Sequence, residues 1–324
     1  MIRVFASIAI LSTMASGDIL LVPEEYPTIQ HAMDSASNGD VIDLANGVWL
    51  DQIVWGLSGV TLRGRDGGET IIDGSQQVWS PVVCYGEPTV IENITFQNGQ
   101  GSDIFGLIRG GAIYIEFANA TIRNCAFQNN TVDFGKFDLG AIGGAICNYY
   151  GSLNIESCSF NNNACNGSQE KFGSGGGAIY SIAGELTVTD STFEQNSSES
   201  NGGAINIDYE KYSLITNCDF LLNSADYLGG AINSQKSNPT LSNNYFCHNT
   251  YKQIAGKWID NGGNIMKVKC GTCPDINGDG YVNISDVLAI LNHWNMTDSS
   301  ADVNGDSIVD IADILLVISA WGSC

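Results

Sequence analysis

The sequence predicts an all-β protein, a right-handed parallel β-helix solenoid with an N-terminal capping helix, followed by a small α-helical domain of two loop-helix units. Three observations support this. A Gly-Gly-Ala-Ile cluster and a Phe-x-x-Asn cluster alternate along most of the chain; short β-type runs lie between them, without a segment of helical period; and a 27-residue unit occurs twice near the C-terminus. A roughly fixed period with variable insertions indicates a solenoid, in which each repeat packs against its neighbours.

The first seventeen residues have the composition of a secretory signal peptide. Arg3 precedes a short apolar run from Val4 to Met14, and Ala15-Ser16-Gly17 predicts cleavage before Asp18. The run is too short to span a bilayer, and no later segment is long and apolar enough to do so. We therefore expect a secreted protein, extracellular or associated with a cell surface, without a transmembrane segment.

The next segment predicts a cap for the solenoid. Residues 22–28 are typical of an extended segment, and an amphipathic helix follows, with Ile29, Ala32, Met33 and Ala36 on one face. The segment resembles the N-terminal cap of pectin-lyase-like β-helices, which covers strand edges that would otherwise pair with other chains. The first coils are expected from Val41–Leu44, Val60–Leu62 and Thr70–Ile72.

The repeats predict the β-helix itself, over residues 18–270. The glycine cluster begins at Gly110, Gly143, Gly176, Gly202 and Gly229, with a variant at Gly262; the phenylalanines are Phe96, Phe127, Phe160, Phe193, Phe220 and Phe246. Stacked short strands with Ile, Val and Phe inside, and corners at Gly and Asn, give a parallel β-helix. The two clusters resemble the repeats of polymorphic outer-membrane proteins.

Alignment of the repeats on phenylalanine predicts the register. Arg123 should lie between Glu92 and Glu156 on neighbouring coils. Cys125 and Cys158 should face inward on adjacent coils, about 4.8 Å apart, which permits a disulfide, although buried free thiols are the expected state.

The duplicated C-terminal unit has the spacing of a hard-cation loop. Oxygen side chains stand at loop positions 1, 3, 5, 9 and 12, and position 7 offers its backbone carbonyl, which is the ligand pattern that suits calcium. We predict two Ca²⁺ ions, the second held more weakly because Ser307 replaces the turn glycine Gly280. The predicted ligands are Asp275, Asn277, Asp279, Tyr281, Asn283 and Asp286 in the first loop, and Asp302, Asn304, Asp306, Ile308, Asp310 and Asp313 in the second.

These two units, over residues 271–324, resemble a type I dockerin. The resemblance implies a cohesin-like protein or a cell-surface component as the partner, contacted through loop positions 10 and 11. Those positions are Ile284, Ser285, Ile311 and Ala312. The alternative is a calcium-stabilised spacer, because bound cations also hold small domains together.

Charge and cysteine content restrict the function further. A net charge of −22 with thirteen Lys and Arg excludes nucleic acid, whose binding needs a basic face, and favours cations. Ten cysteines in an exported chain permit disulfides, and the candidates are Cys247, Cys270, Cys273 and Cys324. A redox or zinc role for Cys270 and Cys273 lacks a βαβ context or a second Cys-x-x-Cys motif.

No catalytic residues are predicted, because Asp190 and Asp219 form the best carboxylate pair and lack a basic partner. The leading hypothesis is a secreted calcium-binding modular protein with a β-helix of adhesion or binding character. Aromatic platforms for a polysaccharide or a protein are expected from Phe134, Phe137, Tyr149, Tyr150, Tyr209 and Tyr212. The alternatives are a carbohydrate-active enzyme, a lyase or epimerase on acidic polysaccharide, and a purely structural surface protein.

Overall fold

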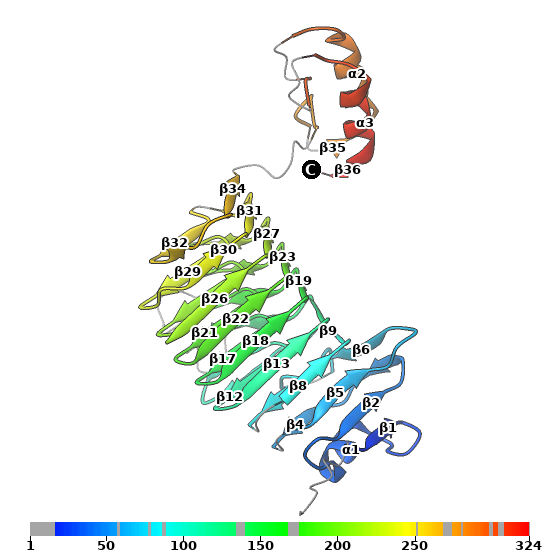
Figure 1. The fold of residues 1–324 in the computed structure, drawn as a ribbon, viewed down its shortest axis with the longest axis vertical. Coiled ribbons are helices and arrows are strands. Elements are labelled where there is room, and N and C mark those ends of the chain that lie inside the picture. The colour runs from blue at the N-terminus through cyan, green and yellow to red at the C-terminus, as the bar shows by residue number, and fades with distance from the viewer. Residues whose placement is uncertain are drawn as a thin grey trace, which may run out of the picture. The chain divides into compact units, whose positions relative to one another are not determined.

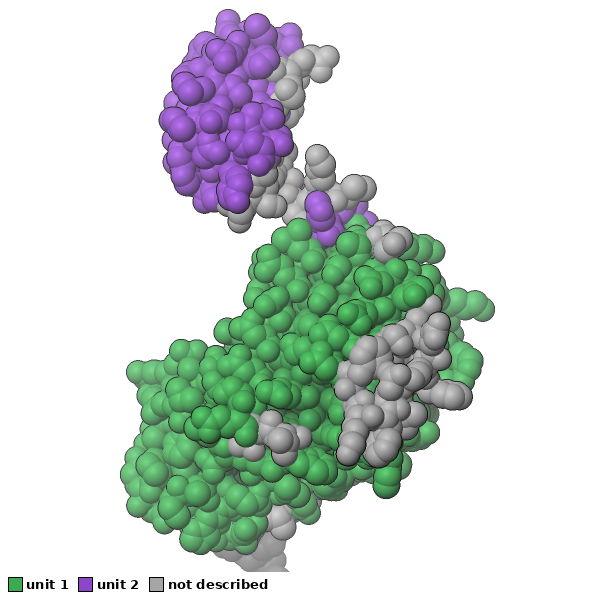
Figure 2. Space-filling model, turned by 180° about the vertical axis from the view of Figure 1, so that it is seen from behind, with its two compact units in different colours: residues 1–245, 249–264 green, residues 246–248, 265–324 purple. Residues whose placement is uncertain are grey.

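The computed structural model of the chain divides into two compact units, coloured separately in Figure 2. One comprises residues 1–245 and 249–264, the other residues 246–248 and 265–324. The domain limits at residues 17 and 270 stay predictions. The structure describes residues 17–56, 59–76, 79–85, 89–133, 140–167, 175–250, 252–267, 274–279, 281–297, 301–303 and 308–323.

Three long sheets of parallel strands, here called A, B and C, form the solenoid; those of sheet A lie side by side in Figure 1. Sheet A contains β1 (Ile19–Val22), β2 (Val41–Leu44), β5 (Thr61–Gly64), β8 (Thr89–Glu92), β13 (Asn119–Arg123), β18 (Ser152–Glu156), β22 (Glu185–Thr189), β26 (Tyr212–Thr216), β30 (Thr240–Ser242) and β33 (Ile259–Asp260). Sheet B contains β3 (Gly47–Trp49), β6 (Thr70–Asp73), β9 (Thr95–Gln97), β14 (Ala126–Gln128), β19 (Ser159–Asn161), β23 (Thr192–Glu194), β27 (Asp219–Leu221), β31 (Tyr245–Cys247) and β34 (Ile265–Lys267). Sheet C contains β4 (Ile53–Trp55), β7 (Val82–Cys84), β12 (Ile113–Glu116), β17 (Ile146–Tyr149), β21 (Ile179–Ile182), β25 (Ile205–Asp208), β29 (Ile232–Gln235) and β32 (Ile254–Gly256).

Two smaller sheets lie between sheets B and C along the chain. One has four parallel strands, and in the other an antiparallel hairpin precedes a parallel pairing. They comprise β15 (Thr131–Asp133), β20 (Ala164–Asn166), β24 (Ser197–Ser198) and β28 (Ser224–Ala225), and β10 (Ser102–Ile104), β11 (Leu107–Arg109) and β16 (Ala141–Ile142). Each coil therefore passes from sheet A through B to C and back, and the predicted parallel β-helix is confirmed.

The phenylalanines form one stack inside the solenoid. The rings of Phe127, Phe160 and Phe193 are fully buried or nearly so, and neighbouring centroids lie 4.7 Å apart with interplanar angles of 4° and 2°. Phe96 and Phe220 extend the stack. The inter-strand spacing sets this distance, so parallel pairing stacks identical residues directly over one another. The register predicted from the repeats is confirmed.

The asparagines of the Phe-x-x-Asn clusters form a buried hydrogen-bonded ladder. The Nδ2 of Asn163 donates to Asn196 Oδ1 at 2.9 Å and to the carbonyl of Phe127 at 3.0 Å. Its Oδ1 accepts from the backbone N–H and from the Nδ2 of Asn130. The ladder thereby satisfies the backbone at a corner where strand pairing stops. Its members are Asn130, Asn163, Asn196, Asn223 and Asn249.

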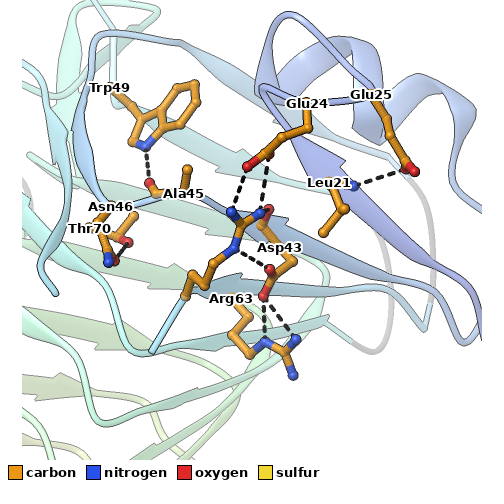
Figure 3. A network of polar contacts seen from close by, with 10 residues as sticks. Leu21, Glu24, Glu25, Asp43, Ala45, Asn46, Trp49, Arg63 and Thr70 are labelled. Carbon is orange, nitrogen blue, oxygen red and sulfur yellow. Dashed lines mark hydrogen bonds and ion pairs between the residues drawn. The ribbon is translucent and has the colours of Figure 1, made fainter. Parts of the chain in front are cut away.

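Helix α1 (Ile29–Ser35) lies at the N-terminal end of the solenoid, as the cap prediction expects (Figure 1). Thr28 caps its N-terminus, and Ile29, Ala32 and Met33 are buried. Close by, Asp43 accepts from Arg63 at 2.9 Å and from Arg65 at 2.7 Å, and the ion pair with Arg63 is drawn in Figure 3. This network ties the first two coils together.

The second unit is helical and internally repeated. Helices α2 (Ile284–Asn292) and α3 (Ile311–Ser319) pack on an apolar core that includes Val282, Ile290 and Val309. A short antiparallel pair, β35 (Tyr281–Val282) and β36 (Gly322–Ser323), joins its two ends. Among the described helices, none has the length and apolar character needed to cross a membrane.

Candidate functional site

The first predicted calcium loop is closed by Asp286. This residue is fully buried, and its Oδ1 accepts from the backbone N–H of Ile276 at 2.7 Å while its Oδ2 accepts from the N–H of Asn283 at 2.8 Å. The carboxylate at loop position 12 is thus held against loop positions 2 and 9. The same side chain completes a capping box at the start of α2.

The other side chains of this loop turn inward through local hydrogen bonds. Asp275 Oδ1 accepts from the N–H groups of Gly278 and Asp279 at 2.7 and 3.1 Å. Asn277 Oδ1 accepts from the N–H of Asp279, and Asp279 Oδ1 from the N–H of Tyr281.

The second loop repeats the closing contacts. Asp313 is fully buried, its Oδ1 accepts from the N–H of Val303 at 2.7 Å, and its Oδ2 accepts from the N–H of Asp310 at 2.8 Å. Asp310 caps α3 as Asn283 caps α2. Asn304 and Asp306 lie outside the described residues, as do Ser307 and Gly280, so the difference predicted between the two sites stays a prediction.

The donor chemistry of these loops suits a calcium ion. A buried carboxylate is costly without a compensating charge, and Asp286 and Asp313 are both fully buried. Within the described part of the chain, no three His, Cys, Asp or Glu side chains are gathered tightly enough to hold a metal. Asp275, Asp279 and Asp286 of the first predicted set therefore do not form such a group, and Asp306 of the second set lies outside the described residues. The ligand assignments stay predictions.

Both helices present apolar side chains to solvent. Ile284, Leu288 and Leu291 of α2 are 58%, 53% and 49% exposed. They recur one repeat later as Ile311, Leu315 and Ile318, which are exposed to a similar degree. Of the predicted partner residues, Ser285 is also exposed, and Ala312 is half-buried.

Each helix ends before the tryptophan that follows it in the repeat. Helix α2 ends at Asn292, before Trp294, and α3 ends at Ser319, before Trp321. Both tryptophans lie beyond the helices and are about half exposed. His293 and Ala320, the C-cap residues, have φ near −107°, outside helical geometry.

On the solenoid, the arginines have structural contacts. Arg123 pairs with both Glu92 and Glu156 across the strands, as predicted, and its ion pair is with Glu92. Arg109 donates to the hydroxyl of Tyr114 at 2.7 Å. Asp190 and Asp219 lie exposed on neighbouring coils, and Asp190 accepts from Asn217.

Six cysteines are free thiols buried in the solenoid: Cys84, Cys125, Cys147, Cys158, Cys165 and Cys218. Cys125 and Cys158 are thus not joined, in agreement with the expected state. Burial raises the pKa of Cys84 and Cys147 to about 12. Cys247 is buried and is not among these free thiols. Cys270, Cys273 and Cys324 lie outside the described residues, so disulfide pairing stays a prediction.

Two features of the solenoid were not predicted. Glu210 is 7% exposed, and burial raises its pKa to about 7 although Ser181 donates to it at 2.5 Å. The guanidinium of Arg109 lies 4.4 Å from the ring centroid of Tyr149. Neither can be read from periodicity, because each depends on where a corner or insertion places one side chain.

Of the predicted aromatic platforms, Phe134 and Phe137 lie outside the described residues. Tyr150, Tyr209 and Tyr212 are 48%, 51% and 52% exposed. Tyr149, less exposed, contacts Tyr150 edge to face at 4.7 Å.

Comparison with known families matches both parts of the chain. Residues 274–321 match the dockerin type I domain, and residues 190–208 match the Chlamydia polymorphic membrane protein repeat. No curated protein and no solved structure is detectably similar. The first match covers both loops and both helices of the second unit, and the second covers β23, β24 and β25, which are part of one coil of the solenoid.

Proposed function

We propose that this chain, a parallel β-solenoid that carries a dockerin type I domain, is an exported modular protein whose solenoid binds a ligand. The dockerin domain attaches it to a cohesin-like partner or a cell-surface component. Calcium organises the loops, and the helices that follow them present the partner surface. The observation that supports this proposal most strongly is the duplicated loop-helix unit, in which Asp286 and Asp313 are buried at equivalent positions.

Calcium would be held in the first loop by Asp275, Asn277, Asp279, Asn283 and Asp286, with the carbonyl of Tyr281. The second loop would use the equivalent residues. A bound cation supplies the positive charge that the clustered carboxylates lack, and so couples metal binding to folding of the unit.

The partner surface would include Ile284 and Ile311, each the first residue of its helix. Exposed apolar side chains on a small unit are a source of binding free energy when a partner covers them. The matching exposure of Leu288 and Leu315 on the same helices extends each surface.

A binding role for the solenoid is favoured over catalysis. Each arginine beyond Arg3 contacts a neighbouring carboxylate or aromatic ring. A lyase needs a base near the acid group of its substrate. Within the described part of the chain, the exposed pair Asp190 and Asp219 has no ion pair with a Lys or Arg, and so lacks the basic partner that such a reaction needs.

The test is capture of the full chain on an immobilised type I cohesin domain, with calcium and with EDTA. We expect calcium-dependent capture that is lost when Ile284→Asp and Ile311→Asp are combined. Aspartate in the first helical turn is compatible with the helix, so the unit should still fold. Val48→Asp, at a 60% exposed position on the solenoid, is the matched control. Capture that persists in EDTA or in the double variant would contradict the proposal.

A further inference from the structure

The corner between sheets C and A carries one left-handed residue in each of five successive coils. These residues follow β12, β17, β21, β25 and β29 directly, and their φ values lie between 51° and 61°. We call them the corner column: Phe117, Tyr150, Ala183, Tyr209 and Lys236.

The left-handed backbone of the corner column does not explain why aromatic residues occur there. The corner between sheets A and B also has left-handed residues, and there they are Asn93, Asn124, Ser157, Asp190, Asn217 and Asn243. Asn and Asp tolerate this conformation, whereas a bulky side chain with positive φ is an outlier. Three aromatic residues at the C–A corner therefore work against local preference, and such conflicts are expected at functional sites.

The aromatic rings of the column are held in place but remain open to solvent. Phe117 and Tyr150 stack with centroids 5.3 Å apart, and are still 63% and 48% exposed. Tyr149 braces Tyr150 and lies under Arg109. Tyr209, 51% exposed, has the ammonium of Lys236 4.0 Å from its ring centroid. Rings fixed before binding lose little conformational entropy when a ligand covers them.

The spacing fits an extended chain of flat rings. Tyr150 and Tyr209 lie two coils apart, with Ala183 on the coil between them. The Phe117–Tyr150 pair and Tyr209 therefore form two aromatic platforms about 10 Å apart, which is twice the inter-strand spacing. The small alanine leaves room between the platforms. An aromatic face packs well on a flat apolar face such as that of a pyranose ring.

Hydrogen-bonding groups lie beside the column on sheet A. A shallow hollow of about 270 Å³ crosses β13, β18 and β22, which Figure 1 shows side by side. Its lining includes Asn119, Thr121, Ser152, Asn154 and Thr187, whose amides and hydroxyls can both donate and accept. A ligand rich in hydroxyl groups matches this lining.

The charges near the column exclude a polyanion. Glu116, Glu185 and Asp208 lie beside it in sequence and offset Arg109 and Lys236, while the whole chain carries −22. That field repels a polymer with an acid group on each sugar.

We propose that the C–A corner binds an extended neutral glycan, stacked on the Phe117–Tyr150 pair and on Tyr209, with its hydroxyls over the sheet A hollow. This deepens the binding role of the solenoid and rests on the proposed function. The ligand of the solenoid is then an uncharged polysaccharide, and not the acidic polysaccharide of the lyase or epimerase alternative.

The test is calorimetric titration of the full chain, in calcium, with cellohexaose, xylohexaose, mannohexaose and hexagalacturonate. We expect at least one neutral hexasaccharide to bind, and the combined Tyr150→Asn and Tyr209→Asn variant to bind about tenfold more weakly or worse. Its melting temperature should stay the same or rise, since asparagine suits left-handed backbone. Tyr227→Asn, at a 47% exposed tyrosine outside the column, should bind normally.

Four results would overturn the inference: no neutral glycan binds; hexagalacturonate binds more tightly than all of them; the double variant binds like the unmodified chain; or its melting temperature falls along with binding, which would make the rings structural. Cohesin capture of the same samples separates the two proposals. Retained capture without glycan binding contradicts this inference alone.

Discussion

Replacing Asn163 by alanine should destabilise the solenoid more than any exposed substitution. The residue is fully buried in the middle of the asparagine ladder, and its amide makes four hydrogen bonds. Truncation leaves the backbone N–H of Asn130, one Nδ2 hydrogen of Asn130 and the carbonyl of Phe127 without their partner. Asn196 Oδ1 keeps the backbone N–H of residue 163.

The magnitude follows from the unpaired groups. A buried polar group that loses its partner costs about 1–3 kcal/mol, so three such groups lower the free energy of unfolding by about 3–6 kcal/mol after some relaxation. For a solenoid of this size, that corresponds to a fall in melting temperature on the order of 10 °C.

The assay is thermal unfolding of the calcium-loaded full chain, followed by the far-ultraviolet circular dichroism of the strands. Asn161→Ala is the matched control, because Asn161 lies half-buried on the outer side of β19, two residues from the ladder. The control should change the free energy of unfolding by about 0.5 kcal/mol or less. If Asn163→Ala melts within about 2 °C of the control, the ladder does not stabilise the coils as inferred.

Three further predictions concern the buried side chains of Cys147, of Glu210, and of Asp286 with Asp313. Cys147, whose pKa burial raises to about 12, should resist iodoacetamide at pH 8 in the folded chain and react once denatured, as mass spectrometry will show; rapid native labelling would contradict this. Glu210 has a folded pKa raised from 4.5 to about 7, so the unfolded state loses its proton first as pH rises, and stability falls between pH 4.5 and 7 by up to about 3 kcal/mol. Glu210→Gln should remove that fall in denaturant titrations at pH 5 and 8, and an unchanged pH dependence would refute it. Combining Asp286→Ala and Asp313→Ala should abolish the calcium-induced gain of helical circular dichroism, while a retained gain would exclude both residues as ligands.

The repeats determined much of the solenoid in advance. Because parallel coils stack equivalent residues, alignment on phenylalanine was enough to pair Arg123 with Glu92 and Glu156 and to place Phe127 beneath Phe160. The cap helix was also predictable, because Ile29, Ala32 and Met33 have the spacing of one helix face and this face is buried.

What lies outside the repeats could not be predicted. The antiparallel hairpin of β10 and β11 falls in a variable insertion between the two clusters, where no period constrains the chain. On sheet C, Tyr114 and Tyr180 point outward and are nevertheless buried, so the alternation that marks an exposed face is lost. In the loops, the spacing of oxygens was visible from sequence, but the contact of Asp286 with the start of its loop needed the fold.

Calorimetric titration of the full, metal-free chain with calcium tests the attachment role most directly. Two bound ions per chain are expected, together with a gain of helical circular dichroism and, afterwards, capture by the cohesin domain. A chain that takes up no calcium, or that is captured equally well without it, would contradict the role assigned to the paired loops.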